Sequence, residues 1–344
     1  MNNSSRKAMD IALATEARAM YANLLTDADK RRIGAMRTTD ELVSFLLRSP
    51  AWREAAMGLP PMGATDTQFA EALGRCLFED YERLYRFAND ASKEFLIFMT
   101  YEAELKFLLS ALRKLSVGAA GELFYIPAGA QRLTKGFNMA RLKEARSFQD
   151  IVEGAAGSIY GHTLRELTID PVTGNPSFNE AALMLEGQFY RSLDRYLKTG
   201  YRGPSKRELA QSVTFRADMV NIGYLLRLRR FGTPVQEALK LLLPMHGALG
   251  PEMERRILEA GSDEEAIEQI RASRLGKWFG GVDAASPESL VRAAESAFYR
   301  KIIHGAPNLS VVDAFLKLKE NEARMLRRAF VALQYGLGPD GYMD

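Results

Sequence analysis

The sequence has few of the residues that mark secreted, metal-binding or membrane-spanning proteins. Its 344 residues include one cysteine, Cys76, which excludes an internal disulfide and is typical of a reducing compartment. Apolar runs such as Phe95–Met99 and Leu241–Met245 are far below the roughly 18 residues that a membrane span needs. The first ten residues also lack the apolar core of a signal peptide. We therefore expect a cytoplasmic protein without a transmembrane span.

Neither basic nor acidic residues are in large excess. The chain has 46 basic and 43 acidic residues and a net charge of +3, so no strong overall field attracts nucleic acid. The basic clusters contain no interleaved aromatic residues on which bases could stack. We expect no nucleic-acid partner.

Motifs for catalysis and cofactor binding are missing as well. The sequence has no P-loop and no nucleophile elbow. The three histidines, His162, His246 and His304, are scattered over the chain, which disfavours a metal site. The glycine-rich stretch at 154–161 matches no phosphate-binding spacing, and we interpret it as a loose helix or close-packing segment. The sequence thus predicts no catalytic residue, no cofactor and no metal.

A repeated helix start is present instead. A hydroxyl residue with an acid three positions on has the spacing of a helix capping box. Copies recur about every 110 residues, as in a diverged internal duplication. They lie at Thr38–Glu41, Ser147–Asp150 and Ser262–Glu265. Aromatic pairs recur with similar spacing, at Phe189–Tyr190 and Phe298–Tyr299, and indicate core packing between helices.

Strand signals are nearly absent, with one short candidate at 124–126. The chain is therefore predicted to be all-α. The repeats divide it into three similar helical units, at 1–125, 126–232 and 233–344.

Each predicted unit contains a helix in which one acid leads an apolar face. The acids are Glu104, Asp218 and Glu322, and each is followed by apolar residues at i+4 and i+8. They could point into a shared cavity around a pseudo-threefold axis. Alternatively, each caps or pairs with an arginine of a neighbouring helix and holds the repeat together. Triplication favours the structural alternative, because catalysis seldom needs three equivalent copies of one group.

Two basic clusters lie toward the ends of predicted helices. They consist of Arg227, Arg229 and Arg230, and of Arg324, Arg327 and Arg328. Positive charge at a helix C-terminus complements the helix dipole, so solvated helix ends explain them. The alternative is a positive patch that faces an acidic protein partner.

Several segments resemble one protein family along the whole chain. They are Ala17–Thr26, Asp218–Arg227, and Lys319–Arg324 followed by Tyr335–Leu337. In order and spacing they are similar to the central-stalk subunit of V-type and archaeal-type ATPases, called C in prokaryotic and d in eukaryotic complexes.

The resemblance implies three similar helical bundles arranged as a pseudo-threefold funnel. It implies a non-catalytic rotor subunit that couples the central-axle subunits to the membrane ring of proteolipid subunits during ion transport. Such a subunit is peripheral, on the cytoplasmic face of the membrane, and has no active site. We expect loops to contact these partners, with candidates at 116–131, 168–178, 243–251 and 280–287.

Two other functions stay open. The first is a helical-repeat adaptor that binds a protein partner on a concave face. Units of about 110 residues are longer than common solenoid repeats, which argues against it. The second is a helical enzyme with an acidic cavity built from Glu104, Asp218 and Glu322.

Overall fold

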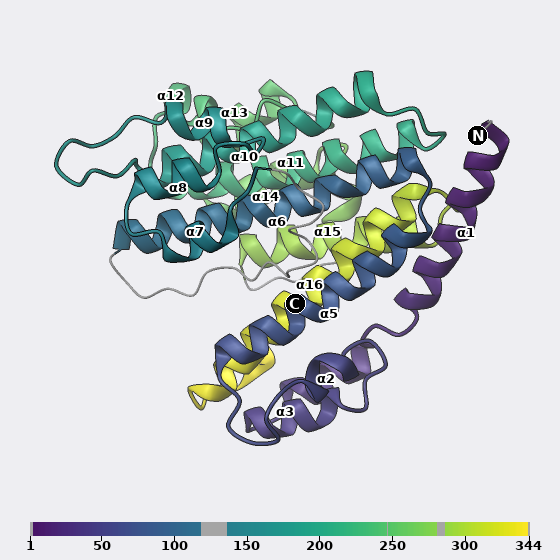
Figure 1. The fold of residues 1–344 in the computed structure, drawn as a ribbon. Coiled ribbons are helices and arrows are strands. Elements are labelled where there is room, and N and C mark those ends of the chain that lie inside the picture. Colours follow the sequence, from purple (N-terminus) through teal and green to yellow (C-terminus); the bar gives the residue numbers. More distant parts are fainter. Residues whose placement is uncertain (1–2, 118–135, 246, 281–285, 343–344) are drawn as a thin grey trace. The chain divides into compact units, whose positions relative to one another are not determined.

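A computed structural model describes residues 3–117, 136–245, 247–280 and 286–342 (Figure 1). These ranges contain helices and loops but no β-strand, and Ile169 and Pro176 form only an isolated antiparallel bridge. The all-α prediction is confirmed. The candidate strand at 124–126 lies outside the described residues. None of the described helices is both long enough and apolar enough to cross a lipid bilayer.

The chain folds into two compact units. The first comprises Met1–Lys93, Gly203–Ser205 and Phe298–Asp344, and the second comprises Glu94–Arg202 and Lys206–Ala297. The first unit thus combines the beginning and the end of the chain. The threefold division at 1–125, 126–232 and 233–344 and the funnel arrangement stay predictions.

The first unit contains short helices near the N-terminus and two long helices. In chain order they are α1 (Asn3–Tyr21), α2 (Asp27–Gly34), α3 (Thr39–Leu46), α4 (Arg53–Met57), α5 (Asp66–Phe87), α16 (Leu309–Gln334) and the 3-10 helix Pro339–Tyr342. It also includes the start of α6 (Asp90–Val117) and the end of α15 (Pro287–Ile303).

The second unit contains the rest of α6 and α15 and the helices between them. These are α7 (Met139–Glu144), α8 (Phe148–Gly154), α9 (Gly161–Glu166), α10 (Phe178–Arg195), a π-helix (Tyr196–Gly200), α11 (Lys206–Arg230), α12 (Val235–Lys240), α13 (Pro251–Glu259), α14 (Asp263–Arg271) and a 3-10 helix (Gly276–Trp278).

The three predicted helix starts are confirmed at α3, α8 and α14. The pairs are Thr38 with Glu41, Ser147 with Asp150, and Ser262 with Glu265. In each pair the hydroxyl accepts a 3.2 Å hydrogen bond from the backbone N–H of the acid. The acid side chain in turn accepts from the N–H of the residue before the cap, at 2.7 or 3.1 Å. The same local sequence therefore builds the same helix start three times.

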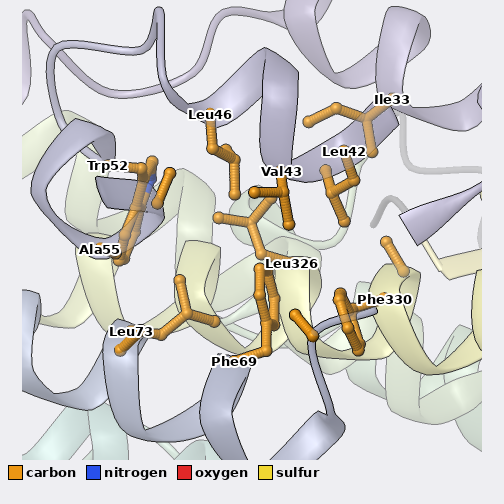
Figure 2. Packing of buried hydrophobic residues seen from close by; sticks show 14 of the residues in the cluster. Ile33, Leu42, Val43, Leu46, Trp52, Ala55, Phe69, Leu73, Leu326 and Phe330 are labelled. Atoms are coloured by element: carbon orange, nitrogen blue, oxygen red, sulfur yellow. The ribbon is translucent and has the colours of Figure 1, made fainter. Parts of the chain in front are cut away.

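The core of the first unit joins residues from both ends of the chain (Figure 2). Helix α16 packs on α1, α3 and α5. The ring of Phe330 on α16 stacks on Phe69 of α5, with centroids 4.3 Å apart and planes 13° from parallel. Leu326, one turn before Phe330, is fully buried in the same cluster as Leu42 of α3 and Trp52. The last long helix thus completes the core that the first helices begin.

The glycine-rich stretch at 154–161 packs closely in the second unit. The N–H of Gly157 donates a 3.2 Å hydrogen bond to the carbonyl of Gly136. A Cβ on Gly157 would lie 2.8 Å from the Cα of Gly136, so a side chain would force the two backbones apart. The close-packing interpretation is confirmed.

Candidate functional site at the acids of the long helices

The three repeated acids lie on the three longest of the described helices, α6, α11 and α16. All are buried, with Glu104 2%, Asp218 1% and Glu322 7% exposed. Buried carboxylates are stable only when hydrogen-bond donors or cations surround them. Their contacts therefore indicate what each acid does.

Glu322 joins α16 to two turns near the N-terminus. Its Oε1 accepts a 2.9 Å hydrogen bond from the backbone N–H of Leu25, and its Oε2 accepts a 2.6 Å bond from the indole Nε1 of Trp52. Leu25 directly precedes Thr26, the N-cap of α2, and Trp52 directly precedes α4. One carboxylate therefore fixes the chain where two short helices begin.

The charge of Glu322 is held in an apolar setting. Burial raises the pKa of this carboxyl above its ordinary value, while the hydrogen bonds from Trp52 and Leu25 and the charges of Lys30 and Lys319 oppose the rise. The donors and lysines stabilise a negative charge that burial disfavours.

Asp218 holds a loop to α11 in the second unit. Its two oxygens accept hydrogen bonds from three successive backbone N–H groups, those of Gly247, Ala248 and Leu249, at 2.8, 2.6 and 3.3 Å. One turn further along α11, Asn221 accepts from the N–H of Leu243 at 2.7 Å. The segments 243–245 and 247–249 are thus held by two neighbouring turns of one helix.

Glu322 and Asp218 bind equivalent points of the chain. Leu25 precedes the N-cap of α2, and α2 leads into the capped helix α3. Leu249 likewise precedes Gly250, the N-cap of α13, which leads into the capped helix α14. Each acid therefore ties a long helix to the entry of a pair of short helices. The contacts of Glu322 and Asp218 favour the structural interpretation of these two acids, in which each ties its helix to a neighbouring segment.

Glu104 lies in a tyrosine-rich part of the second unit. Burial and, after it, the negative charge of Glu104 raise the pKa of Tyr101 and Tyr160. The hydroxyl of Tyr160 donates a 2.7 Å hydrogen bond to the carbonyl of Tyr101. One turn along α6, the ring of Phe107 meets that of Phe137 edge-on, with centroids 6.0 Å apart. Phe137 directly precedes Asn138, the N-cap of α7, so α6 also meets the entry of a short helix.

The arginines at the end of α11 are largely paired. Arg229 and Arg230 both bind the carboxylate of Asp263, in the first turn of α14, and the Arg230 bond measures 2.9 Å. The guanidinium of Arg227 lies 5.0 Å from the centre of the Tyr224 ring. This cluster therefore stabilises the contact between α11 and α14, and a role for it toward an acidic partner stays a prediction.

The cluster on α16 differs from expectation. Arg324, Arg327 and Arg328 do not lie at the helix end, because α16 continues to Gln334 and has no basic residue in its last turn. The guanidinium of Arg327 binds both carboxylate oxygens of Asp66, at 3.0 and 2.7 Å. Asp66 is in the first turn of α5, so this pair joins the two long helices of the first unit.

The four loops suggested for partner contacts have different settings. The loop at 243–251 is anchored by Asp218 and Asn221. The loop at 168–178 exposes Val172, which is 91% accessible. Much of 116–131 and of 280–287 lies outside the described residues.

The partners of the acids could not be recognised in the sequence. Leu25 and Gly247–Leu249 act through backbone N–H groups, which no residue type reveals. The signal in the sequence was the position of Leu25 and Leu249, each directly before a helix N-cap.

Comparison with known proteins gives a family for the whole chain. The family model described as ATP synthase (C/AC39) subunit matches residues 13–342, a range that contains all three acids and both basic clusters. A comparison with curated proteins found no match. The matched range covers nearly every described helix and agrees with the segments that resemble the stalk subunit. The chain belongs to the ATP synthase (C/AC39) subunit family.

Proposed function

We propose that the protein is a non-catalytic central-stalk subunit of a V/A-type rotary ATPase. In this role it couples the central-axle subunits to the membrane ring of proteolipid subunits, on the cytoplasmic face of the membrane. The family match over residues 13–342 is the observation that carries the proposal, because it spans nearly the whole chain.

The packing of the long helices suits a part that transmits torque. A coupling subunit must resist deformation, and α6, α11 and α16 are 28, 25 and 26 residues long. Glu322 and Asp218 tie two of them to the entries of short helices by buried hydrogen bonds. A load on a short-helix pair would therefore pass directly into a long helix.

The direct experiment is purification of the tagged protein from detergent-solubilised membranes of its own host. We expect the proteolipid ring and the axle subunits to copurify, with ATPase activity in the eluate. An untagged strain gives the background. If the protein elutes alone or with unrelated soluble proteins, the coupling role is wrong and a helical adaptor becomes the better description.

A second experiment tests coupling itself. Glu322→Gln weakens the tie between α16 and the turns at Leu25 and Trp52. In assembled complexes we expect ATP hydrolysis to continue with fewer ions moved per ATP. Glu268→Gln, an exposed change on α14, should leave the ratio unchanged. Equal coupling ratios in the two variants would contradict a mechanical role for Glu322 in coupling.

A further inference from the structure

The one cysteine of the chain lies against a buried lysine in the first unit. Cys76 on α5 is 6% exposed, and Lys319 on α16 is 2% exposed. The Nζ atom of Lys319 lies 3.6 Å from Sγ of Cys76, and the thiol donates to the carbonyl of Ala51 at 3.3 Å. The contact thus joins two helices at points 243 residues apart in the sequence. The proposed coupling role does not by itself use either side chain.

Several groups hold the lysine beside the sulfur. The Lys319 ammonium binds the carboxylate of Asp80 and donates a 3.1 Å hydrogen bond to the carbonyl of Ala51. It also lies 4.7 Å from the centre of the Trp52 ring, which Figure 2 labels. Lysine is almost never fully buried without partners of this kind. Because these contacts fix Nζ from several sides, the nitrogen stays next to the thiol.

Asp80 stands one turn after Cys76 on α5, so the carboxylate and the thiol meet the lysine from the same helix. Burial raises the pKa of Asp80 above its ordinary value, while the charge of Lys319 opposes the rise. A carboxylate with a raised pKa accepts a proton more readily than a fully exposed one. Asp80 can therefore take the proton that the Lys319 ammonium must lose before its nitrogen can bond to another atom.

The thiol is a target for a small oxidant. Burial raises the pKa of Cys76 and the charge of Lys319 opposes the rise, so the reactive thiolate is a minor form that the lysine stabilises. Hydrogen peroxide, which is far smaller than an aromatic reagent, converts a thiolate to a sulfenic acid, and this condenses with a thiol or a nitrogen. The chain has no second cysteine, and the Lys319 nitrogen lies close to the distance at which atoms react. Lys319 is therefore the nucleophile placed to trap oxidised Cys76.

We propose that hydrogen peroxide links Cys76 to Lys319 through a sulfur–nitrogen bond, a sulfenamide that joins α5 to α16. In the first step the sulfur gives two electrons to peroxide, so that the thiol becomes a sulfenic acid and one water is released. In the second step the Lys319 nitrogen bonds to the sulfur and the sulfur–oxygen bond breaks. Of the two protons that the ammonium loses, one leaves with the hydroxyl as a second water and the other stays on Asp80. A thiol reductant attacks the sulfur and releases the amine, so the bond is reversible.

The test is peptide mapping of the folded, full-length chain after treatment with hydrogen peroxide. Tryptic digestion without reductant should give a species that joins Cys76–Arg83 to Leu318–Arg324 and is about 2 Da lighter than the two peptides together. Dithiothreitol added before digestion should restore the separate peptides. The Tm of the oxidised chain should fall by several degrees when the same sample is reduced, because the bond closes a long loop. Dithiothreitol does not repair methionine sulfoxide, which peroxide also forms, so methionine oxidation cannot explain this change.

Lys319→Arg keeps a positive charge for Asp80 but removes the amine, so Cys76 should be oxidised without a cross-link. The matched control is Lys317→Arg, the same change at a buried lysine of α16 that pairs with Glu320 at 3.2 Å, and it should give the cross-link in wild-type yield. A second control does not depend on how the variants fold. In wild-type protein oxidised in urea the cross-link should be lost, because the sulfur and the nitrogen are no longer neighbours.

The proposal would be overturned by sulfinic acid at Cys76 beside an unmodified Lys319 in the folded wild type. It would also be overturned by a folded chain whose thiol stays unreacted under conditions that oxidise the unfolded chain. A cross-link from Cys76 to another lysine, or equal yields in folded and urea-treated protein, would exclude the role given to the contact with Lys319. Copurification of the ring and axle subunits does not depend on this bond, so a missing cross-link would leave the coupling role intact.

Discussion

The indole Nε1 of Trp52 donates a 2.6 Å hydrogen bond to Oε2 of Glu322, 270 residues further along the chain. Both side chains are buried. The other oxygen of Glu322 accepts from the backbone of Leu25, so one carboxylate joins α16 to two separate turns. A change at Glu322 is therefore the most direct test of how the two ends of the chain hold together.

Glu322→Ala should destabilise the first unit by about 3 kcal/mol, because two buried donors lose their acceptor. Glu322→Gln should cost about 2 kcal/mol, since its amide can accept only at one of the two positions. Urea unfolding followed by tryptophan fluorescence measures both values. The exposed Glu268→Gln should stay within about 0.5 kcal/mol of the wild type. An alanine variant as stable as this control would show that Glu322 does not hold the turns.

The same carboxyl predicts a pH dependence. Burial raises the pKa of Glu322 above its ordinary value of 4.5, so the folded protein binds this proton more tightly than the unfolded chain does. The stability that Glu322 contributes should then fall as pH rises from 4.5 through the folded pKa. The Glu322→Gln variant does not bind this proton, because the glutamine side chain does not titrate.

The measurement is the free energy of unfolding of both proteins between about pH 4 and pH 8. The free energy of unfolding of the wild type should exceed that of Glu322→Gln by the largest amount near pH 4. This difference should fall to a smaller, constant value at higher pH. An advantage that grows with pH would show that the hydrogen bonds and lysines outweigh burial.

We expect Asp218 and Gly247 to be energetically coupled in the second unit. A Cβ on Gly247 would lie 2.7 Å from Oδ2 of Asp218, so Gly247→Ala should destabilise by about 1–3 kcal/mol through this clash. In an Asp218→Ala background the contact with Oδ2 is gone and only Thr214, whose Cβ lies 3.1 Å away, stays close, so Gly247→Ala should cost less. A double-mutant cycle by urea unfolding measures the difference. Additive effects would contradict the contact.

Structural features that depend on neighbouring residues could be predicted from the sequence, as the helix starts at Thr38, Ser147 and Ser262 demonstrate. Each depends on a hydroxyl and an acid three residues apart, so no distant contact is needed. The first turns of α16, which begins at Leu309 after its cap Asn308, are harder to recognise in the sequence. Residues 309–320 are all buried, including Lys317 and Lys319, so this part of the helix has no polar face to reveal its period.

Distant contacts could not be predicted. The apolar face after Glu322 indicated burial, but nothing in it named Phe69 or Trp52 as neighbours. Helical periodicity identifies which side of a helix is buried and carries no information about what covers it.

We expect Asp10 to be a third residue on which the stability of the fold depends. It is 1% exposed and accepts hydrogen bonds from Asn89, Ser92 and Ser205 at 3.0, 2.8 and 3.0 Å. The Ser205 hydroxyl also accepts from the N–H of Leu309, the first residue of α16. Asp10→Ala should therefore cost about 3 kcal/mol.

The matched comparison for Asp10 is Ser205→Ala, which removes one of its three donors and the acceptor for Leu309. It should cost about 1–2 kcal/mol by urea unfolding. In the Asp10→Ala background the loss should be smaller, because one of the two bonds is already gone. Equal losses in both backgrounds would contradict a shared network.

The reactivity of the Cys76 thiol can serve as a chemical probe of the first unit. The thiol is 6% exposed and donates to the carbonyl of Ala51 at 3.3 Å, and burial raises its pKa while Lys319 opposes the rise. Because only the thiolate reacts, the folded protein should resist an aromatic disulfide reagent at about pH 8 and react fully in urea.

Glu322→Ala should speed labelling of the folded chain by about a hundredfold, since 3 kcal/mol changes an opening equilibrium by that order. Asp218→Ala, which loosens the second unit, should leave the rate near that of the wild type. Rapid stoichiometric labelling of the folded wild type would contradict the burial of Cys76 and the packing of α16 around it.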